Sequence, residues 1–370
     1  MSARFLTVVL ERAFNMRDGF GREIDYMRIS VIDSCNLNCY YCNPCDNNEH
    51  CHALNILSVK EVLCIVRAAT RLGIKHFRLT GGEPLLHPQL DEMVLQIKKI
   101  PGVSSVSLTT NAVLLVQHAK WLKEAGIDSI NVSLDTIDAS EYERITKKPL
   151  LEEVKHGINA AIECGIRVKI NVVLTPQTDV VALTRYVAKK GTDIRFIEMM
   201  PVGEGHTNGV EPYKKVIGTL SKLYGEPCRI NTEKTKEINS GNDKRKIPDN
   251  GPAEYYIFPE LGIRVGLIQA IHGKFCDTCN RIRVTADGRL MPCLGSSVTM
   301  DLVPDSWDFA DDVEKDFAIV RALRAAIKAK PRCHNFNDNA VTYTKTTEKK
   351  TTEIEAAEVN AARNMSRIGG

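Results

Sequence analysis

The sequence has no hydrophobic run long enough to cross a membrane and little excess of charge of either sign. No stretch approaches the roughly 18 apolar residues of a membrane span, and residues 1–20 do not resemble a secretory signal peptide. The formal net charge of +3 is too small to indicate binding to nucleic acid or to a membrane surface. We therefore expect a cytoplasmic protein, with neither nucleic acid nor a membrane as its partner.

Cysteine, by contrast, is plentiful, with 12 residues. In a reducing compartment cysteines indicate metal ligands rather than disulfides. Six of them form two triplets, in which x2, x3 and x13 give the number of intervening residues. The first triplet is Cys35-x3-Cys39-x2-Cys42, and the second triplet is Cys276-x2-Cys279-x13-Cys293. A four-iron cluster takes four ligands, so each triplet predicts a 4Fe–4S cluster with one iron open to a small molecule.

A zinc site is the alternative interpretation of the first triplet. Zinc sites usually have four protein ligands, and the sequence offers no evident fourth partner nearby. The spacing therefore favours radical S-adenosylmethionine (SAM) chemistry. Among the other cysteines, Cys64 and Cys164 fall in apolar helical patterns and are expected in the core. Cys45 and Cys51 follow the first triplet closely and are ambiguous, with incidental thiols favoured over metal ligands.

From residue 26 to about residue 200, short apolar strands alternate with amphipathic helices. The predicted strands are 27–32, 76–80, 103–109, 129–134, 168–174 and 193–199. The predicted helices are 58–72, 88–99, 114–125, 138–162 and 178–190. Six such units predict an α/β fold, a partial (β/α)6 TIM-like barrel, because a closed barrel needs eight. Another part of the chain must then cover its mouth.

After residue 200 this alternation stops. Residues 203–211 and 231–253 are predicted loops, and a helix is predicted at 313–330, ended by Pro331. Short strands are predicted around the second triplet, at 255–258, 263–268, 281–285 and 289–292, with Asp287-Gly288 as a hairpin turn. The expected parts are a barrel with an N-terminal extension, a small C-terminal region carrying the second cluster, and a flexible tail. Their ranges are 1–230, 231–330 and 331–370.

Gly81-Gly82-Glu83-Pro84 directly follows the second predicted strand. Glycines let a ligand approach the backbone, and Glu83 can accept a hydrogen bond from an ammonium group. Such a motif is also typical of an ordinary turn. Its place about forty residues after the first triplet favours contact with the methionine end of SAM. Ser133, at the end of the fourth strand, and Tyr41, suited to stacking near an adenine, are further candidates.

Basic residues collect in or beside the predicted strands. Taken singly, each is typical of a surface residue or of half an ion pair, because unpaired charge is costly inside a barrel. Together they would suit a polyphosphate, since arginine forks match phosphate oxygens. The six residues are Arg28, Arg78, Lys169, Arg195, Arg281 and Arg283.

Taken together, these motifs resemble the GTP 3′,8-cyclases, the radical SAM family that opens molybdenum cofactor biosynthesis. The matching stretches are GREIDYMRISVIDSCNLNCYYC, FRLTGGEPLLHP, LTTN, INVSLD, KINVVL, IRFIEMMP, HGKFCDTCNRIRVTADGRLMPCL and the terminal RIGG. They cover about 21–200, 271–295 and the extreme C-terminus, whereas 231–253 and 300–350 match poorly.

The resemblance implies a lyase that converts GTP into (8S)-3′,8-cyclo-7,8-dihydroguanosine 5′-triphosphate. The cluster of the first triplet would chelate SAM, and the open iron of the second would bind the guanine base. The implied SAM contacts are Tyr41, Gly82, Ser133 and Met200, to which the GGEP argument adds Glu83. The implied GTP contacts are Arg28, Lys75, Arg78, Thr109, Lys169, Arg195, Arg281, Ile282 and Arg283. Gly369 and Gly370 match a catalytic tail that reaches into the active site.

The implied partners are an electron donor such as flavodoxin or ferredoxin and a downstream cyclic pyranopterin monophosphate synthase, and a homodimer stays open. Two other functions also stay open. A radical SAM enzyme with an auxiliary cluster that modifies a peptide would carry extra cysteines, but it needs neither the cations nor a Gly-Gly end. An iron–sulfur scaffold or electron-transfer protein would not need GGEP or Ser133.

Overall fold

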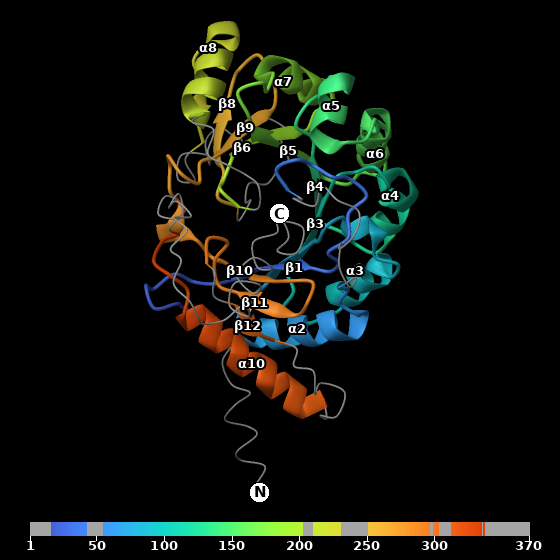
Figure 1. The fold of residues 1–370 in the computed structure, drawn as a ribbon, viewed down its shortest axis with the longest axis vertical. Helices are drawn as coiled ribbons and strands as arrows, with labels where there is room; N and C mark the ends of the chain where they lie inside the picture. The colour runs from blue at the N-terminus through green and yellow to red at the C-terminus, as the bar shows by residue number, and fades with distance from the viewer. Residues whose placement is uncertain are drawn as a thin grey trace, which may run out of the picture.

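The computed structural model describes most of the chain: residues 16–42, 55–202, 210–230, 251–296, 299–302, 312–334 and 336. Within these ranges one sheet has 12 strands, in the order β12-β11-β10-β1-β2-β3-β4-β5-β6-β9-β8-β7. Figure 1 shows the strands in an arc around the centre of the molecule, with α2 to α7 on the outer side. The protein therefore has the expected α/β fold, built on one curved sheet with helices on its outer side.

Six parallel strands and their helices form the N-terminal part of this arc. The strands are β1 Tyr26–Ser30, β2 His76–Thr80, β3 Ser105–Thr110, β4 Ser129–Ser133, β5 Val168–Leu174 and β6 Asp193–Glu198. The helices are α2 Val59–Arg71, α3 Leu90–Lys98, α4 Leu115–Glu124, α5 Ala139–Thr146, α6 Leu151–Glu163 and α7 Val180–Lys189. Each strand predicted from the sequence is present to within a few residues.

The predicted helix at 138–162 was wrong in one respect, because it consists of two helices, α5 and α6. Lys147 ends α5 in the left-handed conformation, with φ of 61°. Pro149 follows two residues later, and its ring prevents a continuous helix. The break turns the chain back just beside the loop of the first triplet.

The C-terminal region adds a parallel strand to each edge of the six-stranded sheet. β9 Arg264–Ile268 pairs with β6, and β10 Arg281–Val284 pairs with β1. Outside them lie β8 Glu254–Ile257, β7 Cys228–Arg229, β11 Arg289–Met291 and β12 Met300–Asp301. Residues 269–280 connect the two added strands and so run from one edge of the sheet to the other.

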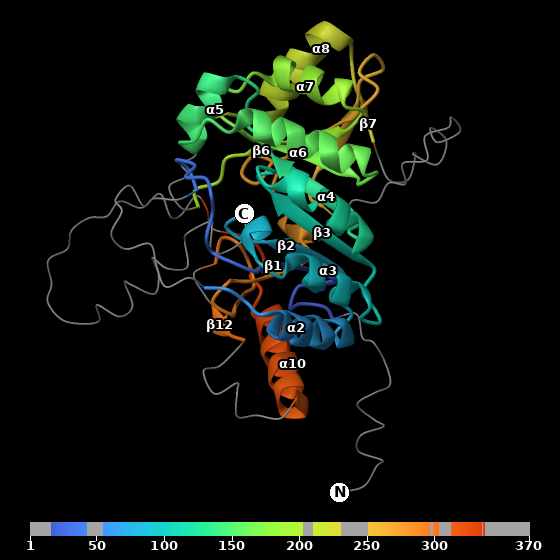
Figure 2. The ribbon, with the colours of Figure 1, turned by 90° about the vertical axis from the view of Figure 1, so that its right-hand side faces the viewer.

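Two helices complete the C-terminal part. α10 Asp312–Lys328 lies beside α2, as Figures 1 and 2 both show. α8 Gly218–Tyr224, preceded by a π-helical turn at Tyr213–Ile217, packs near α7 and was not predicted. The expected hairpin turn is present, with Gly288 at φ of 76° between β10 and β11. The predicted loops lie almost wholly outside the described residues.

Side chains alternate along the strands between an apolar and a polar face. In β1, Met27 and Ile29 are fully buried toward the helices, whereas Tyr26 and Arg28 line a central cavity. The inner face of the arc is thus available for polar ligands, while its outer face forms the core. Cys64 is buried on α2 as expected.

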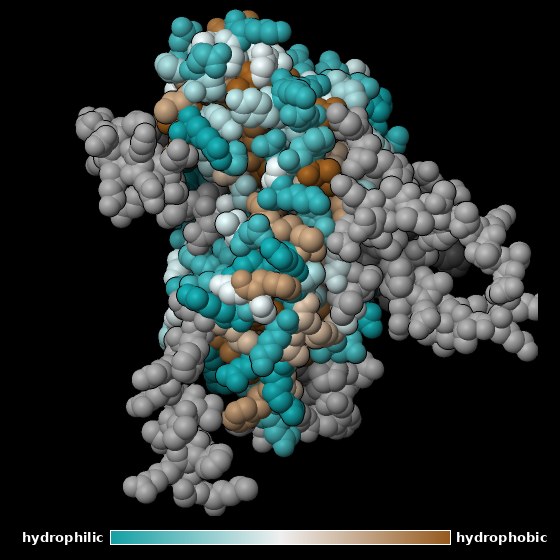
Figure 3. Space-filling view, turned by 90° about the vertical axis from the view of Figure 1, so that its left-hand side faces the viewer, coloured by the Kyte–Doolittle hydropathy of each residue, from teal (hydrophilic) through white to brown (hydrophobic). Residues whose placement is uncertain are grey.

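The outer surface is mixed in character. Figure 3 shows hydrophilic and apolar residues interspersed over one face of the molecule. No helix among the described residues is long and apolar enough to cross a membrane.

Candidate active site

All six cysteines of the two triplets line one central cavity of about 300 Å³. This volume is within the range of small-molecule sites. The first triplet follows β1, and the second triplet lies near β10 and β11. β10 pairs with β1, and β11 pairs with β10. The β1–β10 pairing therefore brings together two cysteine groups that are far apart in the chain.

The loop of the first triplet is fastened to the end of α5. Asn38 N–H donates to the Thr146 carbonyl (3.0 Å), and Tyr40 N–H donates to the Ile145 carbonyl (3.1 Å). Burial raises the pKa of the Cys35 thiol to about 11. A thiolate at this position therefore needs a positively charged partner, which an iron cluster would provide.

The two glycines of GGEP let the motif run against the backbone of this loop. Gly82 N–H donates to the Ile32 carbonyl (2.7 Å), and Glu83 N–H donates to the Ser34 carbonyl (2.8 Å). A Cβ on Gly82 would lie 2.1 Å from the Ser34 carbonyl oxygen, which no side chain permits. The sequence argument expected a ligand near these glycines, and the structure places the protein's own cysteine loop there as well.

Glu83 is 1% exposed and accepts three hydrogen bonds from the protein. The donors are Leu85 N–H (3.0 Å), the Thr110 hydroxyl (2.7 Å) and Asn111 N–H (2.7 Å). Burial raises the pKa of Glu83 to about 7. The Asn111 amide in turn donates to Asn36 (2.7 Å), within the first-triplet loop. Glu83 thus orders the surroundings of the first triplet, and its contact with SAM stays a prediction.

Asp135 is a cavity residue that the sequence analysis missed. It accepts a hydrogen bond from the Tyr41 hydroxyl and another from Val173 N–H (2.8 Å). A signal was present, because the carboxylate closes the INVSLD stretch at the end of β4. Tyr41, Ser133 and Met200 also line the cavity, as do Gly82 and Glu83. All five predicted SAM contacts therefore face one space.

Three arginines lie in register on neighbouring strands. Arg28 of β1 pairs with Arg78 of β2 on one side and with Arg283 of β10 on the other. We call these three residues the arginine row. Burial first, and then the nearby charge of Arg281, lowers the pKa of Arg283 to about 10. Positive charge concentrated in this way favours a polyanionic ligand.

Other predicted GTP contacts are divided between the cavity and its surroundings. Thr109 and Arg195 line the cavity, and the Arg195 guanidinium donates to the Asn171 side chain (2.9 Å). Arg281 also lines it and lies over the Phe275 ring, 5.4 Å from its centroid. The lining does not include Lys75, Lys169 or Ile282, the last being fully buried.

The second triplet lies in an electropositive setting. Cys276 and Cys279 bracket a short 3₁₀ turn, Cys276–Thr278, and Cys293 follows β11. Burial raises the pKa of Cys279, but the charges of Lys330 and Arg281 outweigh it and leave this pKa below its ordinary value. The thiolate of Cys279, the form that binds iron, is therefore stabilised, whereas burial raises the pKa of Cys276.

The donor atoms of both triplets suit an iron–sulfur cluster, because 4Fe–4S clusters are held by cysteine thiolates. Among the described residues, no group of three or more His, Cys, Asp or Glu side chains is arranged to hold a single metal ion. Cys45, Cys51, Gly369 and Gly370 lie outside the described residues.

Two family models match the chain in succession. Residues 29–182 match the radical SAM superfamily, and residues 192–336 match Molybdenum Cofactor Synthesis C. A GTP 3′,8-cyclase of Clostridium perfringens (strain SM101 / Type A) is 35% identical over 324 residues, 87% of this chain and 95% of that protein. A GTP 3′,8-cyclase of Pelotomaculum thermopropionicum is 36% identical over 327 residues, 86% of this chain and 95% of that protein.

Solved structures with a similar fold include Streptococcus suis SuiB. The form bound to the precursor peptide SuiA matches with a TM-score of 0.55 and 14% identity, over 87% of this chain and 69% of SuiB. The form bound to S-adenosylmethionine matches with a TM-score of 0.51 and 16% identity, over 80% and 68%. At these identities the likeness concerns the fold alone.

Proposed function

Because this chain belongs to the GTP 3′,8-cyclase family of radical SAM proteins, we propose that it converts GTP into (8S)-3′,8-cyclo-7,8-dihydroguanosine 5′-triphosphate for molybdenum cofactor biosynthesis. The observation that carries the proposal is that one cavity holds both cysteine triplets and the arginine row. This combination provides for two clusters and for a triphosphate in one space.

The first triplet would hold a 4Fe–4S cluster together with SAM. Bound there and given one electron by a reductant, the pair would supply the radical chemistry that removes a hydrogen atom from a substrate carbon. The chain's own task is orientation. GGEP and Asn111 hold the triplet loop from one side, and the Tyr41–Asp135 pair holds it from another. The SAM contacts in this proposal are Tyr41, Gly82, Glu83, Ser133 and Met200.

The second triplet would hold a 4Fe–4S cluster whose open iron takes the guanine base. The arginine row would take the triphosphate, since a guanidinium fork donates two parallel hydrogen bonds to phosphate oxygens. With the base and the phosphates both fixed, the ribose has little freedom, and a displacement of about 1 Å would already cost much of the rate. Lys75, Lys169 and Ile282 would act from outside the cavity lining.

Several finer features belong to the same proposal. The enzyme would be a lyase of the cytoplasm, reduced by flavodoxin or ferredoxin and followed in its pathway by cyclic pyranopterin monophosphate synthase; a homodimer remains open. Residues 1–230 would form the barrel part, 231–330 the second-cluster region and 331–370 a tail. Gly369 and Gly370 would enter the active site from that tail.

The test is anaerobic reconstitution with iron and sulfide, followed by incubation with SAM, a reductant and GTP. The expected products are 5′-deoxyadenosine and the cyclised nucleotide in matched amounts. Titration with GTP separates this function from that of a peptide-modifying enzyme. The arginine row favours a polyphosphate, so a cyclase should bind GTP tightly and a peptide-modifying enzyme should not. Formation of 5′-deoxyadenosine without any GTP-derived product would contradict the proposal.

A further inference from the structure

A tight turn near the N-terminus holds a buried ion pair. The Asp18 carboxylate accepts hydrogen bonds from Phe20 N–H (2.9 Å) and Arg22 N–H (3.0 Å), and from Arg22 Nε (2.5 Å). Gly21 has φ of +81°, a conformation that favours glycine. The Asp18 and Arg22 side chains are 0% and 6% exposed. The sequence Asp-Gly-Phe-Gly-Arg therefore fixes the Arg22 guanidinium in one orientation.

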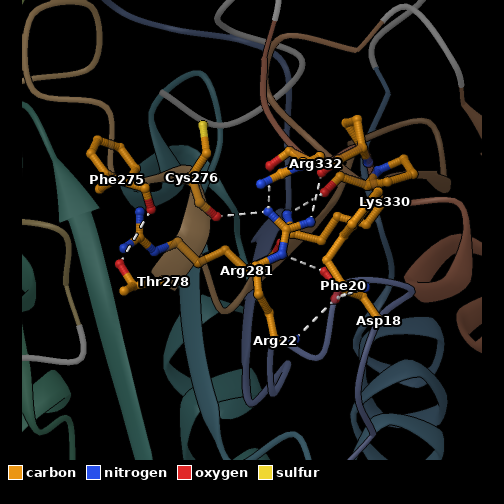
Figure 4. A network of polar contacts seen from close by, with 11 residues as sticks. Asp18, Phe20, Arg22, Phe275, Cys276, Thr278, Arg281, Lys330 and Arg332 are labelled. Atoms are coloured by element: carbon orange, nitrogen blue, oxygen red, sulfur yellow. Dashed lines mark hydrogen bonds and ion pairs between the residues drawn. The ribbon is translucent and has the colours of Figure 1, made fainter.

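This guanidinium joins three distant segments of the chain. Nη1 donates to the Cys276 carbonyl (2.7 Å) and to the Arg332 carbonyl (2.9 Å), while Nη2 donates to the Pro331 carbonyl (2.6 Å). Figure 4 shows Arg22 at the centre of this network, between the N-terminal turn and the second-triplet loop. One side chain thus fixes the backbone of a predicted cluster ligand.

A second buried cation acts from the same C-terminal segment. Lys330 Nζ donates to the Arg281 carbonyl (2.7 Å) and to the Pro292 carbonyl (2.8 Å). Pro292 directly precedes Cys293, and Arg281 lies two residues after Cys279. We call residues 330–332 the strap. The strap reaches the backbone beside Cys279 and Cys293, and Arg22 ties it to the backbone of Cys276.

The same loop also supports a predicted substrate contact. Phe275 precedes Cys276, and its ring lies under the Arg281 guanidinium. A shift of the Cys276 backbone would move Phe275 and with it Arg281. The geometry of the second triplet and that of the arginines beside it are thus mechanically coupled.

We propose that Arg22 is a positioning residue for the second cluster, acting through the Cys276 carbonyl and the strap. The inference rests on the proposed function, in which the second triplet holds a 4Fe–4S cluster that faces GTP. Arg22 does not line the cavity, so its effect on GTP passes through the loop alone. Removing one partner of a buried ion pair is destabilising, so the test must separate a positioning effect of Arg22 from a loss of stability.

The test uses the full-length, anaerobically reconstituted protein and the variants Arg22→Lys and Arg22→Met. Lysine keeps the positive charge beside Asp18 but lacks the fork that reaches three carbonyls. The matched control is Arg71→Met, since the Arg71–Asp316 ion pair (2.7 Å), in which Arg71 is exposed, ties α10 to α2 away from the second triplet. The measurements are iron per chain, the electron paramagnetic resonance signal of each reduced cluster, and the affinities for GTP and SAM.

For Arg22→Lys we expect a weakened or altered second-cluster signal and about tenfold weaker GTP binding, the scale of one lost charge-assisted hydrogen bond. The first-cluster signal and SAM affinity should match those of the wild type, as should every property of Arg71→Met. Should Arg22→Met fail to fold, Arg22→Lys still decides. Equal loss of both clusters, or GTP affinity and a second-cluster signal unchanged from the control, would overturn the positioning role. A wild-type protein that lacks a second cluster would instead overturn the proposed function.

Discussion

Replacing Arg283 by methionine should make the protein more stable while weakening its affinity for GTP. Arg283 is 9% exposed and lies in register with Arg28, which has Arg78 on its other side. Burial, followed by the charge of Arg283, holds the pKa of Arg28 well below its usual range. Like charges are therefore gathered in the cavity at a cost to folding, and a bound triphosphate would offset that cost.

The size of the effect follows from strand spacing. Neighbouring strands lie about 4.8 Å apart, and charges roughly 6 Å apart repel by about 3 kcal/mol at an effective dielectric constant near 20. Arg283 also makes favourable contacts that methionine would lose. We expect a net gain of about 1 kcal/mol in stability, or roughly 1–3 °C in the unfolding midpoint. GTP binding should lose about 1.5–3 kcal/mol, which is roughly a 10-fold to 150-fold loss of affinity.

The assay is thermal unfolding without nucleotide, together with anaerobic titration of GTP and of guanosine. The control is Arg289→Met on the adjacent strand β11, because Arg289 pairs with Asp301 at the surface (3.2 Å). This variant should bind GTP normally and gain no stability. If Arg283→Met unfolded at a lower temperature than the wild type, or lost GTP and guanosine affinity equally, the charge-repulsion argument would be wrong.

Three further predictions concern other parts of the site. Gly82→Ala should lower the unfolding midpoint and impair SAM cleavage, because the new Cβ would lie 2.1 Å from the Ser34 carbonyl oxygen; unchanged unfolding and cleavage would mean that the loop yields freely. Alanine at all three cysteines of the first triplet should halve the iron from about eight per chain and abolish SAM cleavage, and retained cleavage would refute that assignment. Deleting Gly369 and Gly370 should leave both clusters and GTP binding intact but reduce cyclised product per 5′-deoxyadenosine, whereas an unchanged ratio would show that the two residues are dispensable.

Local signals made much of the N-terminal α/β part predictable. The helix predicted at 58–72 is present as α2, started by a capping box of Ser58 and Glu61, and the apolar runs place all six strands. Strand partners are a different matter, because a short apolar run carries no information about what it pairs with. The parallel additions of β9 to β6 and of β10 to β1 therefore came from the structure alone. Pro149 signalled the break after Lys147, but the helical periodicity on both sides of it favoured one continuous helix.

Within the site, residue type and spacing predicted both triplets and the collection of cations. The arginine row depends on strand register, which the sequence did not specify. Arg22 and Lys330 donate hydrogen bonds to backbone carbonyls. Every residue has a backbone carbonyl, so the sequence does not indicate which of them a buried cation contacts. Asp18, which orients Arg22, looks like an ordinary turn residue until its partners are known. Positioning residues of this kind can be identified only from the folded structure.

The attachment of β10 to β1 also bears on how the protein is made. When the ribosome has synthesised about 200 residues, β1 to β6 are complete. One edge of β1 is then still unpaired, because its partner β10 lies about 250 residues further along the chain. Until β9 and β10 arrive, the nascent sheet presents two bare edges of the kind that pair with other chains. Among the described residues the finished sheet ends instead in β7 and β12, each only two residues long. We therefore expect a chain that ends before β9 to expose both edges of the six-stranded sheet and to aggregate more readily than the full-length protein.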